Sequence, residues 1–444
     1  MIRRPPRSTL DRSSAASDVY KRQSLYCTRK PERSIALNKK SNSNPPNTGP
    51  LAGVKVLDMS RILAGPTCTQ LLGDYGADII KVEKPGNGDD TRNWGPPFMK
   101  NDRGQDSNES GYFLASNRNK RSLSLDISKE ENVEIIKTLL KDCDVFIENF
   151  KVGSLKKYGL DYQSLSKDFP KLIYCSITGY GQNGPNSHKA GYDLIAQGYG
   201  GLMSITGGPN EEPVKVGVAV ADLLCGLYAC TAILAAINYR TNSGLGQNID
   251  IALVDAQIAS LVNMGTNYLL SKEDPDRVGN EHANIVPYQV FEVYDGHLNV
   301  AIGNDQQFKK FCEIINRSDL SENQKYSTNI MRVSNRSHLI PILKRELKKH
   351  KKDYLVDMME KMKVPGGPIN KLSEVFASNQ VSARKMKIQM ENKNSGKGFV
   401  ELIGNPVKFS ETPVSYRYPP PSCGEHSDEI LNEIMSKKDN NEIK

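Results

Sequence analysis

Short apolar segments alternate with helical ones between residues 51 and 253, and this alternation constrains the fold most. Val54–Asp58 alternates between apolar and polar residues and ends in a carboxylate, as a buried strand does. Pro66 suits the first turn of a helix over Thr67–Tyr75, and Gly76 suits its C-terminal cap. Asp78–Glu83 is then a second strand. This order predicts two parallel strands joined by a crossover helix.

The pattern recurs further along the chain. Further strands are predicted at Arg121–Asp126, Cys143–Glu148, Leu172–Ile177 and Gln247–Leu253, and helices at Lys129–Lys141 and Ala221–Arg240. Repeated units of this kind place helices on the faces of a parallel sheet. The sequence therefore predicts an α/β, doubly wound fold for this part of the chain.

The texture changes after about residue 275, where we expect a smaller α+β domain. Val286–Phe291 and Leu298–Ile302 are predicted as strands around a turn at Asp295-Gly296. Charged helices follow at Ile340–His350 and Asp353–Met362.

The net charge of +8 belongs to the start of the chain. Residues 1–50 hold eleven basic and three acidic side chains, and the remaining 394 residues hold 48 of each. A neutral body has no global field that attracts nucleic acid or an anionic membrane, so we expect neither as a partner. The longest uncharged apolar run, Leu223–Ile237, is 15 residues and predicts no membrane span.

Residues 1–50 are rich in Pro, Ser, Asn and Arg and are predicted to be a disordered leader. The Arg-rich, acid-poor composition is typical of a mitochondrial presequence. Met1–Gln23, however, resembles translated adapter sequence, so part of the leader is not counted as native. Eight cysteines show no CxxC pair and no His at metal-ligand spacing, which predicts reduced thiols and no metal site.

Two local patterns invite nucleotide or phosphate binding. Glu83 ends the second strand where a ribose-binding acid would stand, but Gly65 and Gly73 do not form GxGxxG, which argues against a dinucleotide site. Asn117–Arg121 places three cations in five residues, and it is either a solvated loop or a phosphate clamp. Lys84, Lys156 and Lys157 also fall at strand or loop ends.

Two carboxylates are candidates for catalysis. Asp222 lies at the start of the long helix, where it is either an N-cap or a nucleophile that the helix N-terminus keeps ionised. Gly226 and Ala229 on the same helix would let another backbone approach closely. Asp193 is the second candidate, and spacing does not rank the two.

A series of motifs, in order over residues 51–430, resembles the family III CoA-transferases. They are Leu51–Asp58, Leu63–Pro66, Leu72–Glu83, Gly88–Arg92, Asn117–Ser122, Val145–Phe150, Ser176–Pro185, Gly191–Gln197, Val216–Gly226, Thr241–Asp250 and Val364–Pro368. The resemblance implies a ring-shaped subunit in an interlocked homodimer, with a Rossmann-like large domain. It implies these segments: leader 1–50, large CoA-binding domain 51–250, linker 251–280, small α+β domain 281–385 and return segment 386–435.

The resemblance also implies a mechanism and a site. Asp222 would attack an acyl-CoA thioester, giving first a mixed anhydride and then an aspartyl-CoA thioester. The expected reaction moves CoA from succinyl-CoA to a dicarboxylic acid such as glutarate or hydroxymethylglutarate, in the mitochondrial matrix. CoA is a substrate here, and no cofactor is expected. CoA contacts are implied for Leu63, Ala64, Lys84, Asn149, Phe150 and Lys157, with Lys84 and Lys157 standing where relatives often have Arg.

Three further expectations follow from the resemblance. The loop Asn280–Tyr288 matches the region that closes over the site in relatives, and Arg61 and Arg92 are candidates to bind the distal carboxylate. A related α-methylacyl-CoA racemase activity needs a His where this chain has Tyr192, and a phenol of pKa ~10 is a poor base at neutral pH. A catalytically inactive CoA-binding protein is the other alternative, against which the presence of Asp222 speaks.

Overall fold

The computed structural model describes residues 48–442, with side chains up to residue 436. The predicted leader, residues 1–50, lies outside the described residues apart from its last three. The interpretation of Met1–Gln23 as adapter sequence lies outside them as well.

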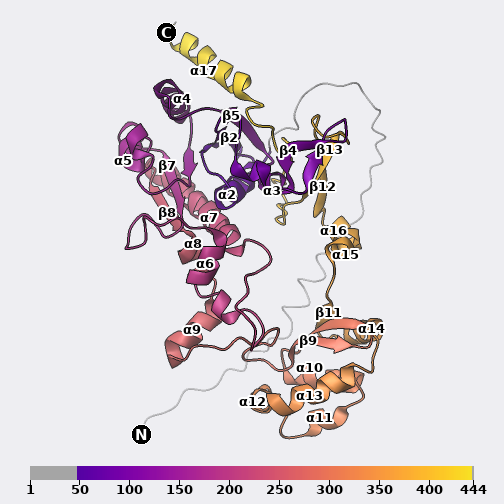
Figure 1. Cartoon of the computed structure of the whole chain (residues 1–444). Coiled ribbons are helices and arrows are strands. Elements are labelled where there is room, and N and C mark those ends of the chain that lie inside the picture. The colour runs from indigo at the N-terminus through magenta and orange to yellow at the C-terminus, as the bar shows by residue number, and fades with distance from the viewer. Residues whose placement is uncertain (1–47, 443–444) are drawn as a thin grey trace, which may run out of the picture. The chain divides into compact units, whose positions relative to one another are not determined.

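Six parallel strands form the main sheet, in the order β5-β2-β1-β6-β7-β8 (Figure 1). They are β1 (Lys55–Asp58), β2 (Asp78–Glu83), β5 (Lys120–Ser124), β6 (Val145–Glu148), β7 (Ile173–Thr178) and β8 (Asn248–Ala252). Counted along the chain within this sheet, the order is 3-2-1-4-5-6, which is the doubly wound Rossmann arrangement. The predicted parallel α/β sheet is confirmed.

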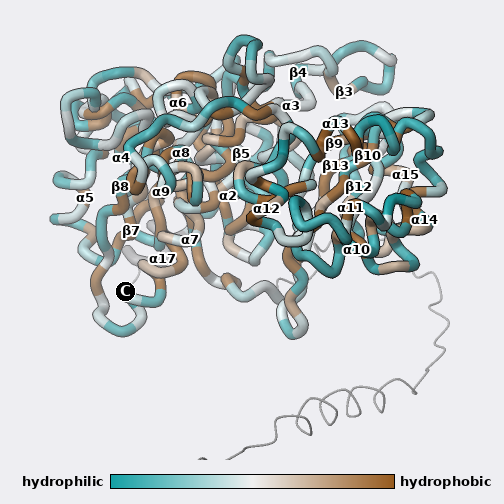
Figure 2. The backbone as a smooth tube through the Cα atoms, turned by 90° about the horizontal axis from the view of Figure 1, so that it is seen from below, coloured by the Kyte–Doolittle hydropathy of each residue, from teal (hydrophilic) through white to brown (hydrophobic). Residues whose placement is uncertain are grey.

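Helices cover both faces of this sheet because its strands are apolar on both sides. On β6, Val145 and Ile147 pack in one core with α2 (Ala64–Asp74), α7 (Val220–Ser243) and α8 (Leu253–Ala259). Phe146 packs in the other core with α4 (Glu130–Leu140), α5 (Tyr162–Asp168) and α17 (Ser427–Glu442). Figure 2 shows the apolar residues gathered along these elements.

Helices α2 and α7 cross with almost no space between their backbones. A Cβ atom at Gly226 would lie 2.6 Å from the carbonyl oxygen of Ala64, so only glycine fits there. Ala229, one turn further on, is fully buried. The predicted close approach is confirmed at Gly226, where it fixes α7 against the start of α2.

Helix α7 is longer than predicted, and among the described helices it alone is long and apolar enough to cross a membrane by length and composition. Its inner residues Ala221, Cys225 and Ile233 are fully buried in the protein core. A core helix passes the same test of length and composition, so this finding by itself does not establish a membrane span.

A separate three-stranded antiparallel sheet, β11-β10-β9, lies later in the chain and packs against helices around its own core. Its strands are β9 (Tyr288–Val293), β10 (Gly296–Ala301) and β11 (Gly366–Pro368). The hairpin turns at Asp295-Gly296 as predicted. Strand β9 begins two residues later than predicted, after Pro287, which has no N–H to give to the ladder.

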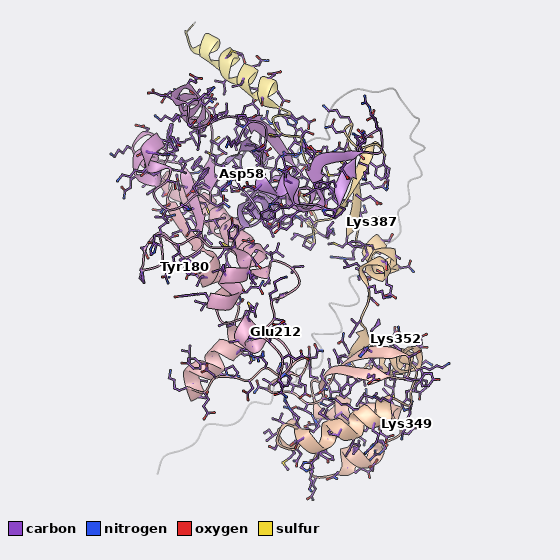
Figure 3. All side chains as sticks on the ribbon, in the orientation of Figure 1. Asp58, Tyr180, Glu212, Lys349, Lys352 and Lys387 are labelled. Carbon is purple, nitrogen blue, oxygen red and sulfur yellow. The ribbon has the colours of Figure 1, made fainter. Side chains whose placement is uncertain are left out.

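The helices of this region are α10 (Asp305–Ile314), α11 (Ser318–Glu322), α12 (Asn329–Ser334), α13 (Arg336–Leu347) and α14 (Lys352–Met362). Helix α13 starts four residues before the predicted Ile340 and includes Pro341. Lys349 and Lys352, labelled in Figure 3, lie at the junction of α13 and α14.

The remaining elements are short. Two antiparallel pairs are β3 (Phe98–Lys100) with β4 (Asp106–Ser110), and β12 (Lys387–Glu391) with β13 (Phe399–Ile403). The other helices are α3 (Gly111–Ser116), α6 (Asp193–Tyr199), α9 (Val262–Ser271), α15 (Leu372–Ala377) and α16 (Asn379–Ala383), with 3-10 turns η2 (Asp90–Asn93), η3 (Lys156–Tyr158) and η4 (Met203–Ile205). The domain boundaries, the ring shape and the interlocked dimer stay predictions.

Candidate functional site

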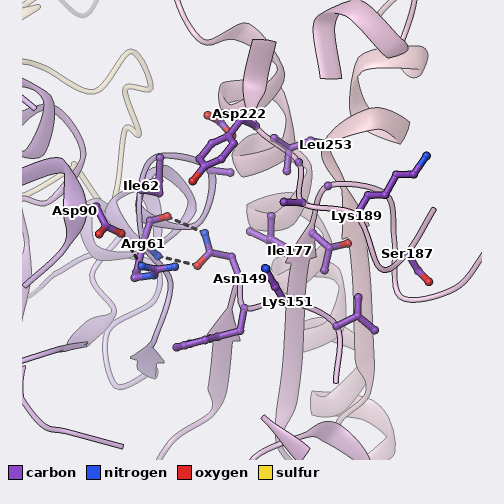
Figure 4. A pocket seen from close by; sticks show the side chains of 18 of the residues that line it. Arg61, Ile62, Asp90, Asn149, Lys151, Ile177, Ser187, Lys189, Asp222 and Leu253 are labelled. Carbon is purple, nitrogen blue, oxygen red and sulfur yellow. Dashed lines mark hydrogen bonds and ion pairs between the residues drawn. The ribbon is translucent and has the colours of Figure 1, made fainter. Parts of the chain in front are cut away.

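The carboxyl ends of β1 and β6 lie side by side where the strand order of the sheet reverses. Ligands of doubly wound sheets bind at this switch point. Here the segments after the two strands line a cavity of about 390 Å³, which we call the main cavity. Asn149, after β6, ties them together: the Arg61 N–H donates to Asn149 Oδ1 over 2.9 Å, and Asn149 Nδ2 donates to the Arg61 carbonyl over 2.8 Å (Figure 4).

A buried ion pair holds the loop after β1 in place by hydrogen bonds to its backbone. The Lys81 ammonium donates to Asp89 and to the Ser60 carbonyl, both over 2.9 Å, and neither charged side chain is exposed. Asp89 also accepts from the Ile62 N–H. Burial by itself raises the pKa of Asp89, but the charge of Lys81 and the hydrogen bonds from Lys81 and Thr91 outweigh it and lower the pKa to about 2.

The cations of Asn117–Arg121 are neither in a solvated loop nor in a phosphate clamp, so both interpretations are wrong. Arg118 pairs with Asp74, Lys120 with Asp58 and Arg121 with Asp78, and all three basic side chains are buried. Asp58, labelled in Figure 3, ends β1. Burial outweighs the charge of Asp58 and lowers the pKa of Lys120 to about 8. These cations fix the sheet and its first helix.

Arg92 and Glu83 bind each other and do not face a substrate. Arg92 donates twice to Glu83, over 2.8 and 2.7 Å, and once to the Pro421 carbonyl. The Arg92 side chain is buried with its guanidinium 3.7 Å from the centre of the Phe113 ring. The prediction that Arg92 binds a distal carboxylate is therefore wrong, and Glu83 is not free for a ribose.

The implied CoA contacts fall into three places. Ala64, Asn149 and Phe150 line the main cavity, and Leu63 is the N-cap residue of α2 beside it. Lys84 lines a second cavity of about 240 Å³, which shares Arg61 and Phe150 with the first. Lys157 lines neither cavity, and its ammonium lies 4.6 Å from the centre of the Tyr158 ring. Their roles toward CoA stay predictions.

Three basic side chains of the main cavity were not singled out from the sequence: Lys151, His188 and Lys189. Neither lysine ammonium has a hydrogen bond or ion pair to any of the residues that the structure describes. Lys151 directly follows the Asn149-Phe150 motif, which is the one signal that could have found it. His188 and Lys189 lie in a loop that only the folded chain brings to the cavity, so no local sequence pattern could have identified them.

Asp222 lines the same cavity from the first turn of α7 (Figure 4). It is the third residue of the helix and 8% exposed, and the N-cap position is occupied by Ala219. The interpretation of Asp222 as the N-cap is therefore wrong. Within the described part of the chain its carboxylate accepts no hydrogen bond and has no ion pair.

Burial and the charge of Asp193 raise the pKa of Asp222 to about 7. The helix N-terminus was expected to keep this group ionised, but its field does not outweigh the loss of water and a second carboxylate. Asp222 therefore holds its proton to a higher pH than an exposed aspartate, whose pKa is ~4. Asp193 is the first residue of α6, and its carboxylate accepts a hydrogen bond from the backbone of α7.

Tyr192 lines the cavity at the position where a racemase would carry its His. The loop Asn280–Tyr288 contributes no residue to this cavity, so its closure over the site stays a prediction. Within the described residues, no group of three or more His, Cys, Asp or Glu side chains is arranged to hold a metal ion. The expectation that the reaction uses no cofactor stays a prediction.

Comparison with known proteins gives a consistent result. The family model of CoA-transferase family III matches residues 51–427. A succinate–glutarate CoA-transferase of Agrobacterium fabrum is 45% identical over 390 residues, covering 88% of this chain and 97% of that protein. The human succinyl-CoA:glutarate CoA-transferase is 44% identical over 393 residues, 88% of each chain. The crystal structure of a CAIB/BAIF family protein from Brucella suis has a TM-score of 0.77 at 45% identity, covering 88% of this chain and 100% of that one.

Replacing Lys81 should lower the free energy of unfolding far more than replacing an exposed lysine does. Lys81→Met leaves Asp89 buried without its cation, so we expect the free energy of unfolding at pH 7 to fall by about 3–5 kcal/mol. In the wild type the contribution of Asp89 is present above its unfolded pKa near ~4 and is lost as the pH falls toward 2. In the variant Asp89 protonates at higher pH, so the deficit should shrink between pH 7 and pH 5. Urea unfolding at both values measures this.

The matched control is Lys100→Met, which removes an exposed lysine paired with Asp106. Exposed pairs contribute little, and we expect a change of less than about 1 kcal/mol. Equal losses in the two variants would contradict a special role for the buried pair.

Proposed function

The chain belongs to CoA-transferase family III, and we propose that it moves CoA from succinyl-CoA to glutarate or a similar dicarboxylic acid through covalent intermediates on Asp222. That it is a CoA-transferase follows from the family match and from relatives named for this reaction. The choice of glutarate or hydroxymethylglutarate as acceptor and the covalent route are the parts that we propose. One observation carries the covalent route: a buried carboxylate that has no hydrogen bond or ion pair to any described residue lines the cavity at the switch point.

The reaction would begin with ionised Asp222. A carboxylate oxygen attacks the thioester carbon of succinyl-CoA, and the C–S bond breaks to give a succinyl-aspartyl anhydride and CoA thiolate. The thiolate then attacks the side-chain carbonyl carbon of residue 222. This step releases succinate and leaves an aspartyl-CoA thioester.

The acceptor reverses the two steps. A carboxylate of glutarate attacks the aspartyl thioester, forming a glutaryl-aspartyl anhydride and thiolate again. The thiolate attacks the glutaryl carbonyl carbon, which gives glutaryl-CoA and frees Asp222. Each nucleophile and each leaving group is an anion, so no step needs a general base. This fits a site with Tyr192 where a racemase needs His.

The two adjoining cavities suit the two ends of a CoA thioester. The main cavity is lined by Asp222 and by Lys151 and Lys189, which pair with no described residue. The second cavity, with Lys84, shares Arg61 and Phe150 with it. We assign the thioester arm to the first and the nucleotide to the second. The cations supply charge for the phosphates of CoA and for the substrate carboxylates.

Replacing Asp222 tests the covalent route. Asp222→Asn should abolish transfer from succinyl-CoA to glutarate, by a factor of about 10³ or more, because the amide cannot form the anhydride. CoA binding should persist, and the fluorescence of Trp94 reports it, since the chain has one tryptophan and it lines this cavity. Hydroxylamine should trap the wild-type intermediate as a hydroxamate at residue 222.

The pH dependence follows from the raised pKa. Because only the anion attacks, kcat/KM for succinyl-CoA should rise with pH through about 7 and level off above it. The control Asp255→Asn removes an exposed carboxylate on α8 that does not line the cavity, and it should keep full activity. Transfer that survives in Asp222→Asn would rule out the route.

Arg61 is the residue that we propose for the distal carboxylate of the acceptor. One guanidinium nitrogen binds Asp90 over 2.6 Å, and the other two donate no hydrogen bond to any described residue. Arg61 lines both cavities. A guanidinium with two unbonded nitrogens suits a carboxylate because it can donate to both oxygens.

A comparison of two acceptors tests this role. In Arg61→Ala, kcat/KM for glutarate should fall at least about tenfold, while kcat/KM for butyrate, which lacks the distal carboxylate, should change little. Lys189→Ala is the matched variant, since it removes another cation of the same cavity. If Arg61→Ala lowers both acceptors equally and raises KM for succinyl-CoA, Arg61 serves CoA instead.

We also propose that the enzyme acts as a homodimer in the mitochondrial matrix. Exposed apolar side chains gather on the consecutive helices α6 to α9, including Leu194, Leu227, Ile258 and Leu269. Such a surface is typical of one that a second chain covers. Light scattering should give a mass near twice 49.3 kDa, and a monomer would contradict the proposal. The compartment rests on the family resemblance, and import of the full chain into isolated mitochondria tests it.

A further inference from the structure

The junction between α6 and α7 is held by a chain of hydrogen bonds that meets at Asp193. The Ala221 N–H donates to Asp193 Oδ1 over 2.8 Å. Gln197 Nε2 donates to Asp193 Oδ2 over 2.7 Å, and the Val216 N–H donates to Gln197 Oε1 over 2.9 Å. Gln197 is completely buried. Val216, before α7, and Ala221, in its first turn, are thereby both attached to side chains of α6.

This arrangement changes what Asp222 has to do. The first N–H groups of a helix have no partner inside the helix, and an acidic residue in the first turn often satisfies one of them. In α7 the Ala221 N–H is already bonded to Asp193, and the N-cap Ala219 has no side chain that could help. The Asp222 side chain has no hydrogen bond to any residue between 48 and 436, and it lines the cavity.

We propose that Asp193 is a positioning residue for CoA transfer: it caps α7 from α6, and it thereby leaves the carboxylate of Asp222 free to attack the substrate. This inference rests on the proposed function, because it assigns Asp193 a part in the same reaction. Asp193 itself forms no bond to substrate in this scheme, since both of its oxygens already accept hydrogen bonds from the protein.

A second effect follows from the charge of Asp193. Three titratable groups interact electrostatically with Asp222: Asp193 from α6, Tyr112 from α3 and Cys225 on α7 itself. Burial and the charge of Asp222 raise the pKa of Tyr112 and of Cys225. Of the three groups, Asp193 is the carboxylate that raises the pKa of Asp222 together with burial. Removing its charge should therefore ease the ionisation of Asp222, whereas a purely structural loss would not.

Asp193→Asn tests both effects of Asp193, the cap on α7 and the charge that acts on Asp222. The amide offers one acceptor where the carboxylate offers two, and Gln197 cannot turn without losing the Val216 N–H, so one bond breaks in either orientation. We expect kcat to fall about tenfold or more with KM for succinyl-CoA nearly unchanged. The pH at which kcat/KM is half-maximal should move down by about one unit.

The double variant Asp193→Asn with Gln197→Glu restores every bond with the central one reversed. The new amide at position 193 donates to the new carboxylate at position 197, which also accepts from the Val216 N–H. The amide oxygen at position 193 still accepts from the Ala221 N–H. We expect most of the lost kcat to return. Asp168→Asn, an exposed carboxylate of α5, is the control for charge removal and should change neither kcat nor the pH profile.

The outcomes separate this inference from the proposed function. The pKa of Asp222 in the free enzyme can be measured without turnover, by ¹³C NMR of labelled aspartate with Asp222→Asn as the assignment control. A lower Asp222 pKa in Asp193→Asn supports the inference even if glutarate is not the acceptor. An unchanged pKa, or a double variant that regains no kcat, would overturn it.

Discussion

The buried pair of Lys81 and Asp89 is the interaction on which the site depends. Lys81 reaches from β2 to the Ser60 carbonyl after β1, and Asp89 accepts from Ile62, whose backbone is left-handed at φ 73°. A non-glycine residue holds that conformation only when its surroundings enforce it. The loop so fixed leads into α2, whose Ala64 carbonyl sits against Gly226 of α7. The buried pair thus supports the position of Asp222 through the loop after β1 and the contact between α2 and α7.

Asp222 is an exception among the buried charged residues around the main sheet. Lys81, Lys120 and Arg92 are buried, and each faces a carboxylate that balances its charge. Asp222 is almost as deeply buried, pairs with no cation among the described residues, and has its pKa raised by burial and by the charge of Asp193. Burying a charge without a partner costs free energy, and the raised pKa is the form that this cost takes. A cation beside Asp222 would remove the cost, but it would also occupy the oxygen that attacks the thioester in the proposed route.

The sequence predicts those parts of the structure that depend on local pattern. The strands after Val54 and Asp78 and the helix at Ala221 follow from periodicity, and the close crossing follows from Gly226. The cations of Asn117–Arg121 were misinterpreted because their partners, such as Asp74 and Asp58, are brought to them only by the sheet. The pKa of Asp222 was misjudged for the same reason. Burial and the neighbouring Asp193 are properties of the packed chain, and the helix N-terminus is the only part of that environment visible in the sequence.

The proposed exchange places an unusual demand on this environment, because no proton moves in any of its four steps. A hydrolase or racemase must supply a base and hold its pKa near the working pH. Here the one proton that matters is the one on Asp222, and it must only be absent. A pKa of about 7 leaves a substantial anionic fraction at neutral pH, and that anion is largely buried and pairs with none of the described residues. Its reactivity and its cost in stability have the same origin. The fold accommodates this by assigning the cap of α7 to Asp193, so that the same helix is closed at its N-terminus and open toward the substrate.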